Sequence, residues 1–297
     1  MTIRDILSDG IRILSSPCPH AFIDTPSLDA VLLLGEVLNL RREEIISRSN
    51  ESISEIEKKK FESLLTRRME GECVAYILGR REFMGLEFSV DPSVLVPRPD
   101  TETLAETALE YINTMTKQND KKSLSLLDLC TGSGALAISL KYTSEELCEN
   151  ISLSVTALDI CEKALEIARR NAARLLGATE PPLHFIQSDL YEDISGAFDI
   201  IISNPPYIPT GEVCSLAPEV QREPALALDG GRDGLELIRK IIFGSREHLP
   251  SDGVLLLEAG STQMPVIRTL LENGGFGDIR TYRDLAGRER VISGVNA

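Results

Sequence analysis

Two glycines stand where a buried strand would turn into a helix, a place where the backbone can approach a ligand. The segment LLDLCTGSGALAISL puts Gly132 and Gly134 in that turn, after an apolar run and before a helical pattern. Glycine permits a sharp turn without a Cβ in the way, and the N-terminus of the following helix offers free N–H groups. Gly132, Gly134 and Ala137 also fit the dinucleotide spacing G-x-G-x-x-G/A. The loop alone predicts an adenosine-type cofactor and leaves NAD open.

Two acids end the next two predicted strands. Asp159 ends the run 153–159, where a carboxylate can accept hydrogen bonds from the ribose hydroxyls, although it could instead cap the helix beginning at Cys161. Asp189 follows the run 183–187, where it would face an adenine amino group, and for it capping is equally open. Ligands of open α/β sheets bind beyond the carboxyl ends of the strands, so these features together favour a cofactor site.

The fourth predicted strand, 198–203, runs into the sequence NPPY at 204–207. Two prolines remove two N–H groups and fix the backbone, so the strand cannot continue. An NAD enzyme would need a nicotinamide site and usually a proton donor such as histidine. No predicted sheet strand ends in a histidine; the chain has His20, His184 and His248. The end of the fourth strand therefore favours chemistry other than hydride transfer.

The elements that would position these residues form three parts. Residues 1–75 have helical spacing, with Ser54 and Glu57 as a capping box, and predict a small helical bundle. Residues 76–97 alternate around two glycines and predict a hairpin linker. A helix follows Pro99, with Thr103 and Glu106 spaced as a second capping box.

From residue 98 to 297 the chain reads as one catalytic domain. Short apolar runs alternate with helical segments, which predicts a parallel sheet covered on both faces. The strands are expected at 124–129, 153–159, 183–187, 198–203 and 253–259, and the tail predicts a terminal hairpin. The fold class is therefore α/β with a small helical N-terminal domain.

Composition limits the partners. The chain has 297 residues and a formal net charge of −15, which disfavours a DNA-binding surface. Its six cysteines are scattered without a CxxC pair, so we expect neither a zinc site nor disulfides, and a reducing cytoplasm is the simplest location. No apolar run is long enough to span a bilayer, and the start lacks the pattern of a secretory signal. We expect no metal and no membrane partner.

The NPPY segment resembles the signature [NDS]-PP-[YFW] of amino-methyltransferases that use S-adenosylmethionine. An amide or exocyclic amine nitrogen is planar, and its two hydrogens must be held while its lone pair faces the methyl group. The Asn204 side-chain oxygen and the Pro205 carbonyl could each accept one hydrogen, and Pro205 and Pro206 would hold them rigidly. Tyr207 could stack on a planar target. Catalysis would then be positioning and electrostatics, without a strong general base.

The whole chain resembles the protein-glutamine N5-methyltransferases of the PrmC/HemK family, through NPPY, the segment VLVPRPDTE and the run EPALALDGGRDGL at 223–235. The resemblance implies a class I methyltransferase fold, with a Rossmann-like seven-stranded sheet whose last strand is antiparallel, a hairpin linker and a helical substrate-docking domain. It implies S-adenosylmethionine as cofactor, S-adenosylhomocysteine as product, and the Gly-Gly-Gln glutamine of class I peptide chain release factors as substrate.

Carried over residue by residue, the resemblance implies two sets of site residues. The target glutamine would be bound by Asn204, Pro205, Pro206 and Tyr207, with Asn204 also near the cofactor. The implied cofactor contacts are Cys130, Thr131, Gly132, Ser133, Gly134, Asp159, Asp189 and Leu190.

Some positions depart from the family pattern or have open roles. Cys130 stands where the family often has glycine, and Leu190 where some relatives have an aromatic residue; both could change cofactor affinity. Arg98, Asp100 and Glu102 could shape the site or simply order the helix start.

NPPY alone permits adenine N6, cytosine N4 or glutamine N5 as the target. The alternatives are a ribosomal-protein glutamine methyltransferase, an adenine-N6 nucleic-acid methyltransferase, and a binding module without catalysis. Acidic charge favours a protein substrate over DNA. A monomer is expected.

Overall fold

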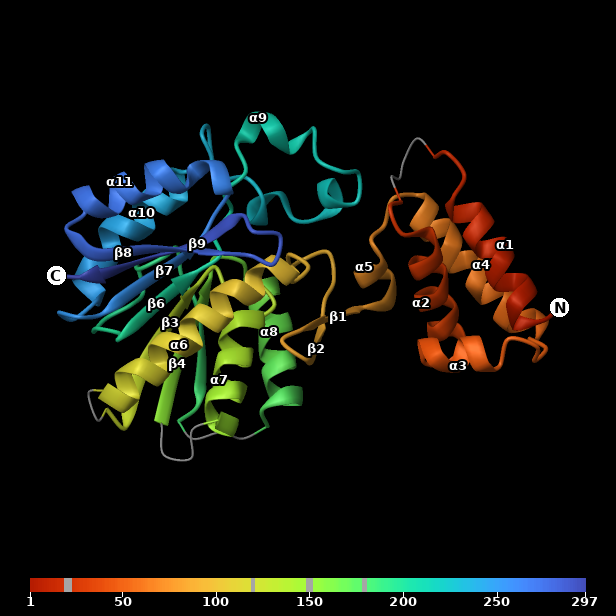
Figure 1. Ribbon diagram of the computed structural model, residues 1–297, viewed down its shortest axis with the longest axis horizontal. Helices are drawn as coiled ribbons and strands as arrows, with labels where there is room; N and C mark the ends of the chain where they lie inside the picture. The colour runs from red at the N-terminus through yellow and green to blue at the C-terminus, as the bar shows by residue number, and fades with distance from the viewer. Residues whose placement is uncertain (19–22, 119–120, 148–151, 178–180) are drawn as a thin grey trace. The chain divides into compact units, whose positions relative to one another are not determined.

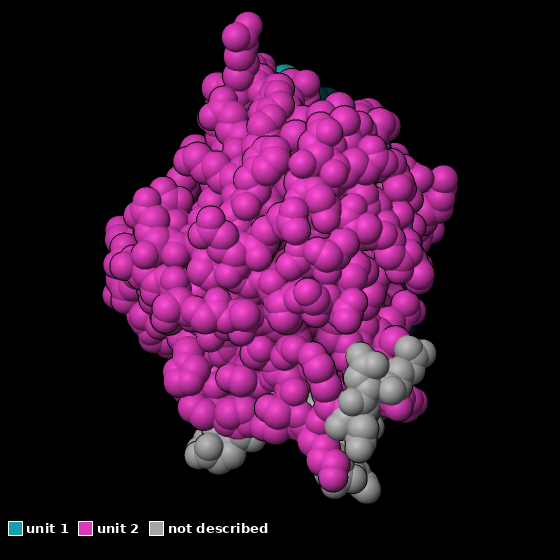
Figure 2. Space-filling model, turned by 90° about the vertical axis from the view of Figure 1, so that its left-hand side faces the viewer, with its two compact units in different colours: residues 1–80, 214–223 teal, residues 81–213, 224–297 magenta. Residues whose placement is uncertain are grey.

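The computed structural model describes residues 1–18, 23–118, 121–147, 152–177 and 181–297. The chain divides into two compact units (Figure 1). Unit 1 comprises residues 1–80 and 214–223, and unit 2 comprises residues 81–213 and 224–297. Figure 2 shows part of the surface of unit 2 in magenta. Unit 1 thus contains a segment that follows NPPY closely in the chain, which the predicted boundaries did not include.

Unit 1 is a bundle of short helices. They are α1 (Ile3–Leu14), α2 (Pro26–Leu38), α3 (Arg42–Ser47), α4 (Glu55–Met69) and α5 (Val74–Leu78). Gly10 lets α1 approach α4 closely, because a Cβ there would lie 2.7 Å from the Phe61 ring. The predicted capping box at the start of α4 is confirmed: the Ser54 hydroxyl accepts from the Glu57 N–H, and the Glu57 carboxylate accepts from the Ser54 N–H at 2.7 Å.

The hairpin lies within the predicted linker 76–97 but does not begin at its first residue. Its strands are β1 (Arg80–Phe83) and β2 (Leu86–Ser89), while Tyr76 and Ile77 are buried residues of α5. The aromatic and β-branched residues at 76–77 therefore mark a short buried helix and not a strand. That helix ends at Gly79, whose φ of +70° is the left-handed geometry common after a helix.

The start of α6 (Glu102–Gln118) also differs from the prediction. A 3-10 turn, η1 (Pro99–Thr101), precedes it, so Thr103 lies inside the helix and is no N-cap. The Thr103 carbonyl accepts from the Thr107 hydroxyl at 2.7 Å. The Glu102 carboxylate leaves the helix to accept from the Met84 N–H of the hairpin at 3.0 Å. The predicted capping box at Thr103 is therefore wrong, because the proline-led turn starts the helix first.

One sheet of seven strands forms the centre of unit 2 in the described residues. Its strands are β3 (Ser123–Leu129), β4 (Ser152–Asp159), β5 (Leu183–Gln187), β6 (Ile200–Ser203), β7 (Val254–Glu258), β8 (Phe276–Arg283) and β9 (Glu289–Asn296). The spatial order is β5-β4-β3-β6-β7-β9-β8, with β9 antiparallel to both neighbours and the other pairs parallel. The predicted strands, the terminal hairpin and the antiparallel last strand are confirmed.

Helices cover both faces of the sheet (Figure 1). One face packs against α6, α7 (Ala135–Leu147) and α8 (Glu162–Leu175), and the other against α10 (Glu236–Ser245) and α11 (Met264–Asn273). Alternate residues of each strand serve the two faces: in β7, Leu256 packs on the α6 side and Leu257 on the α10 side. The remaining short elements are α9 (Thr210–Val213), η2 (Val220–Arg222), η3 (Ala225–Ala227), η4 (Arg246–His248) and η5 (Ser261–Gln263).

Candidate active site

A cavity of about 840 Å³ lies in unit 2 beyond the carboxyl ends of the parallel strands. The ends of β3 and β4 and the turns after β5 and β6 line it, together with the connector 91–98 and the segment 224–237. Its volume falls in the range typical of cofactor sites. The strand ends thus meet at one edge of the sheet, as the sequence predicted.

The glycine loop joins β3 to α7 with its backbone toward this cavity. A Cβ on Gly132, whose φ is +56°, would meet no atom within 4 Å, so the loop is bare there. Gly134 has a different role: a Cβ on it would lie 2.8 Å from the Ile138 Cδ1 and 3.1 Å from the Ala168 Cβ. One glycine therefore leaves space for a ligand, and the other allows close helix packing.

Cys130 adopts a φ of +63°, in the left-handed region where glycine is the usual residue. This geometry gives a physical reason for the glycine that the family often has at this position. The Cys130 side chain lines the cavity, and burial raises the pKa of its thiol. A thiol with a raised pKa is not a nucleophile, so Cys130 acts as a wall of the cavity.

Two acids, Asp128 and Asp159, accept hydrogen bonds from the glycine loop. The Asp128 carboxylate, fully buried in β3, accepts from the Thr131 hydroxyl at 2.6 Å. Asp159 accepts from the Gly132 N–H at 2.9 Å and from the Cys161 N–H at 2.9 Å. Burial raises the pKa of Asp159 and raises that of Asp128 to about 7. Each Asp159 oxygen keeps a lone pair for another donor, so helix capping and ligand binding are compatible.

Asn204 is held at the end of β6 by the turn before α6. Its Nδ2 donates to the Thr101 hydroxyl at 3.1 Å, and Asn204 lines the cavity together with Pro206. Ser203, just before it, donates to the Leu129 carbonyl at 2.8 Å and ties β6 to β3. The amide is therefore fixed between the cofactor loop and the N-terminal turn of α6.

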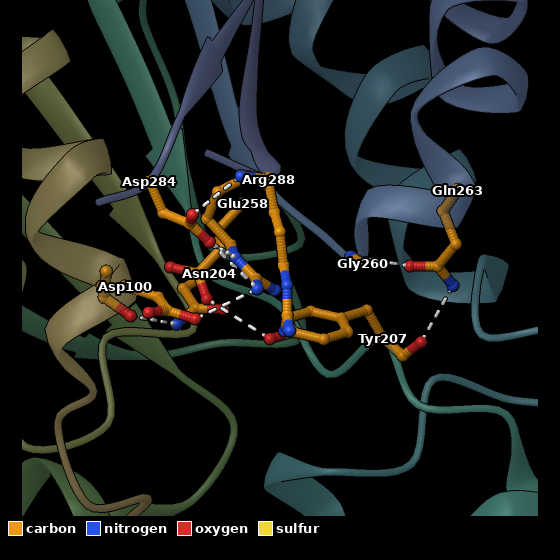
Figure 3. Close-up of polar contacts among 10 residues, drawn as sticks. Asp100, Asn204, Tyr207, Glu258, Gly260, Gln263, Asp284 and Arg288 are labelled. Carbon is orange, nitrogen blue, oxygen red and sulfur yellow. Dashed lines mark hydrogen bonds and ion pairs between the residues drawn. The ribbon is translucent and has the colours of Figure 1, made fainter. Parts of the chain in front are cut away.

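The segment 228–234 and Gln263 pack against the NPPY loop and form hydrogen bonds with its backbone and with Ile208. Ile208 donates to the Leu228 carbonyl at 3.0 Å, and Gln263 Nε2 donates to the Tyr207 carbonyl at 2.9 Å (Figure 3). A Cβ on Gly230 would lie 2.7 Å from the Pro206 carbonyl oxygen. The glycines of DGGRDG therefore permit close packing of two loops, a role that the sequence alone did not reveal.

Tyr207 points away from the cavity. Its hydroxyl donates to Glu258 Oε1 at 3.4 Å, beneath the NPPY loop (Figure 3). Burial raises the pKa of Tyr207, so its hydroxyl remains a donor. Glu258, the last residue of β7, is only 1% exposed. Sequence reasoning missed Glu258, although an acid at the end of a buried strand in VLLLEAG was a usable signal.

The predicted site residues therefore separate into two groups. Among the described residues, the cavity lining includes Cys130, Thr131, Gly132, Ser133, Asp159, Asp189, Leu190, Asn204 and Pro206. It does not include Gly134, Pro205 or Tyr207. Leu190, like Cys130, has a positive φ, at +51°. Of Arg98, Asp100 and Glu102, only Arg98 lines the cavity.

The described residues contain no group of three His, Cys, Asp or Glu side chains placed to hold a metal ion. Within the same residues, no helix is both long and apolar enough to cross a bilayer. The five described cysteines are free thiols.

Comparison with known proteins identifies the family. The model of the PrmC N-terminal domain matches residues 15–79, and that of the methyltransferase small domain matches residues 107–221. A release factor glutamine methyltransferase of Burkholderia pseudomallei is 39% identical over 272 residues, covering 90% of this chain and 91% of that protein. The chain belongs to the release factor glutamine methyltransferases. The resemblance noted from the sequence is confirmed.

Other comparisons agree on family and fold. A release factor glutamine methyltransferase of Moorella thermoacetica is 35% identical over 294 residues, covering 98% of both chains. The crystal structure of the hMettl16 catalytic domain in complex with MAT2A 3′UTR hairpin 6 matches with a TM-score of 0.54 at 15% identity. That match covers 79% of this chain and 82% of the other, and it concerns the fold alone. The predicted α/β methyltransferase fold is confirmed.

Proposed function

We propose that this chain transfers a methyl group from S-adenosylmethionine to the side-chain amide nitrogen N5 of the Gly-Gly-Gln glutamine in class I peptide chain release factors. The observation that carries the proposal is that Asn204 lines the same cavity as the glycine loop and Asp159. An acceptor for an amide hydrogen thus shares one space with the elements suited to an adenosine cofactor. The names of the relatives support a release factor glutamine as the substrate.

The residues at the strand ends fit S-adenosylmethionine. The bare backbone at Gly132 leaves room beside the loop, and Asp159 retains lone pairs for ribose hydroxyls. Asp189 and Leu190 would flank the adenine from the turn after β5. When bound, the cofactor supplies an electrophilic methyl group on a sulfonium.

The chain's own residues would hold the substrate nitrogen. The Asn204 oxygen, turned away from Thr101, accepts one amide hydrogen. The family resemblance implies the Pro205 carbonyl as acceptor of the other, although Pro205 does not line the cavity as the described residues form it. Two prolines and the supporting segment 228–234 keep these acceptors still. The nitrogen becomes acidic as the N–C bond forms and the C–S bond breaks, so its proton can leave to water. The geometry supports an anchoring role for Tyr207 in place of stacking, because its hydroxyl is directed to Glu258.

Mass spectrometry of a release factor after incubation with enzyme and S-adenosylmethionine tests the proposal. We expect a gain of one methyl group on the Gly-Gly-Gln glutamine, and none on a substrate with that glutamine changed to alanine. Asn204→Ala should lower kcat by roughly 100- to 1,000-fold while cofactor affinity stays close to wild type. Methylation of a ribosomal protein or DNA with no transfer to release factor would overturn the proposal.

Monomeric state and the docking of release factor by unit 1 are part of the same proposal. Unit 1 exposes apolar side chains, including Ile46 at 63% and Ile56 at 70% exposure. A deletion of residues 1–75 should raise KM for release factor more than it changes cofactor affinity. Sedimentation of the intact protein should give a single species of about 32.6 kDa.

A further inference from the structure

The turn η1 and the first residue of α6 bind three different elements through three successive side chains. Asp100 forms an ion pair with Arg290 of β9 at 3.0 Å. Thr101, which is 5% exposed, accepts from Asn204 Nδ2 at 3.1 Å, just after the end of β6. Glu102 accepts from a backbone N–H of the hairpin at 3.0 Å. Neighbouring positions of the sequence PRPDTE therefore join the sheet, the NPPY loop and the hairpin at one turn.

Arg290 is held in place independently of Asp100. Its side chain is 11% exposed, and both its Nε and the terminal nitrogen that binds Asp100 donate to Asp284 at 3.3 Å. The side chain of Asp284 is 2% exposed, and its carboxylate accepts from the Arg288 N–H at 2.9 Å (Figure 3). The Arg290 carbonyl accepts from the Ala259 N–H at 3.1 Å, directly after β7. The guanidinium therefore offers Asp100 a charged partner in a fixed position.

The ion pair and the hydrogen bond to Asn204 involve adjacent residues of one short turn. The turn η1 has only three residues. Pro99 fixes its own φ, and the Thr101 N–H donates to the Arg98 carbonyl at 3.1 Å, which closes the turn. Because so little backbone freedom separates the two side chains, a shift of Asp100 also moves the Thr101 hydroxyl.

We propose that Asp100 and Arg290 are positioning residues for methyl transfer: their ion pair fixes the η1 turn, and through Thr101 that turn fixes the Asn204 amide. An amide that donates its nitrogen to Thr101 keeps its oxygen for the substrate nitrogen, so a displaced turn moves that acceptor out of place. Neither Asp100 nor Arg290 lines the cavity among the described residues, so both act from outside it. The catalytic consequence rests on the proposed function, whereas the position of the amide can be observed without substrate.

Asp100→Asn tests the ion pair at its exposed end. The Asp100 side chain is 49% exposed, so the variant should fold with a Tm within a few degrees of wild type. Loss of the charge leaves the guanidinium paired with Asp284, and kcat should fall about tenfold with cofactor affinity unchanged. Asp278→Asn is the matched control: it removes an exposed ion pair with Arg280 at 2.8 Å on β8 and should leave kcat unchanged.

A double-mutant cycle tests whether Asp100 acts through Thr101. Thr101→Val removes the hydroxyl that holds Asn204 and should lower kcat by about 10- to 100-fold, whereas Thr101→Ser should stay within about threefold of wild type. In the Thr101→Val background, Asp100→Asn should change kcat by less than about twofold, because the contact through which it acts is already lost. A loss of about tenfold from Asp100→Asn in both backgrounds would contradict the link through Thr101.

Selective ¹⁵N-asparagine labelling observes the amide without turnover. The Asn204 side-chain NH₂ signal, assigned by its loss in Asn204→Ala, should shift in Arg290→Lys, because an ammonium group lacks the planar fork that reaches both carboxylates. Arg280→Lys makes the same change in the control ion pair and should leave the signal in place. If wild-type enzyme fails to methylate release factor, the proposed function fails while this signal still decides the positioning. An unshifted Asn204 signal in Arg290→Lys, or wild-type kcat in Asp100→Asn, would overturn the inference.

Discussion

Replacing each loop glycine by alanine should separate folding from cofactor binding. Gly134→Ala adds a Cβ at φ +79° that would lie 2.8 Å from Ile138 and 3.1 Å from Ala168. The positive φ costs about 1–2 kcal/mol and overpacking about 1–3 kcal/mol, which together give roughly 2–5 kcal/mol. Gly132→Ala adds only the cost of its φ of +56°, because no atom lies within 4 Å of its Cβ.

Gly134→Ala should therefore have the larger effect on thermal stability, and Gly132→Ala the larger effect on cofactor affinity. Thermal unfolding should show Gly134→Ala lowering Tm by roughly 5–15 °C and Gly132→Ala by a few degrees. Calorimetric titration with S-adenosylmethionine should show about tenfold weaker binding to Gly132→Ala, because the new methyl group enters the cavity where the backbone was bare. Folded Gly134→Ala should bind S-adenosylmethionine with a Kd within about threefold of wild type. That is a difference in binding free energy well under the ~1.4 kcal/mol of a tenfold change.

Gly196→Ala is the matched control. Gly196 is exposed, has a φ of +93°, and a Cβ there would meet nothing within 4 Å. It isolates the cost of positive φ without packing and without the cavity. Equal losses of Tm in Gly134→Ala and Gly196→Ala, or wild-type cofactor affinity in Gly132→Ala, would refute the division of roles between the two loop glycines.

Three other positions and the net charge of the chain give predictions of their own. Gly234→Ala would overlap the Tyr207 carbonyl oxygen and shift the NPPY loop, so kcat should fall by up to about 100-fold with cofactor affinity retained, as steady-state kinetics and titration can check. Asp29→Ala removes the buried one of two carboxylates that lie 2.7 Å from Arg68 and leaves the partly exposed Glu219, so urea unfolding should show unit 1 less stable by roughly 3 kcal/mol, with part recovered when Arg68→Met is added. The pKa of Asp128, about 7 in the fold, exceeds its unfolded value, so the folded state binds the proton more tightly and the free energy of unfolding should fall as pH rises from 4 to 7; Asp128→Asn should make that fall smaller. With a net charge of −15, the enzyme should lose kcat/KM for a basic release factor surface as salt increases, and salt-independent kinetics would exclude steering.

Local patterns predicted the sheet and the edge at which the site lies. Each parallel strand ended within two residues of its expected position, because buried strands are apolar runs and the polar residue after each run marks the edge. From that rule alone Asp159 and Asn204 could be placed in one cavity. The order of the motifs then distinguished a methyltransferase from an NAD enzyme.

Contacts between distant segments could not be predicted in the same way. The pairing of Thr101 with Asn204 depends on where the proline-led turn before α6 meets the sheet, and no local pattern contains that information. The inclusion of 214–223 in unit 1 depends on contacts such as the 2.7 Å ion pair between Arg68 and Glu219. A single charged residue on each side, in segments of ordinary composition, gives no periodic signal.

The same arrangement occurs at two ends of the site. On the cofactor side, buried Asp128 of β3 accepts from the Thr131 hydroxyl; on the substrate side, buried Glu258 accepts from the Tyr207 hydroxyl. Each carboxylate has one oxygen without a partner among the described atoms, and burial raises the pKa of each to about 7. Neither lines the cavity, so neither can take a proton directly from a bound amide. A raised pKa at such a site would ordinarily suggest a general base, but here the geometry assigns both acids to holding a hydroxyl in one orientation. The reaction therefore depends on fixed acceptors and not on a base. Burying two carboxyl groups costs desolvation free energy, and the fixed orientation of the hydroxyls beside them is what that cost supports.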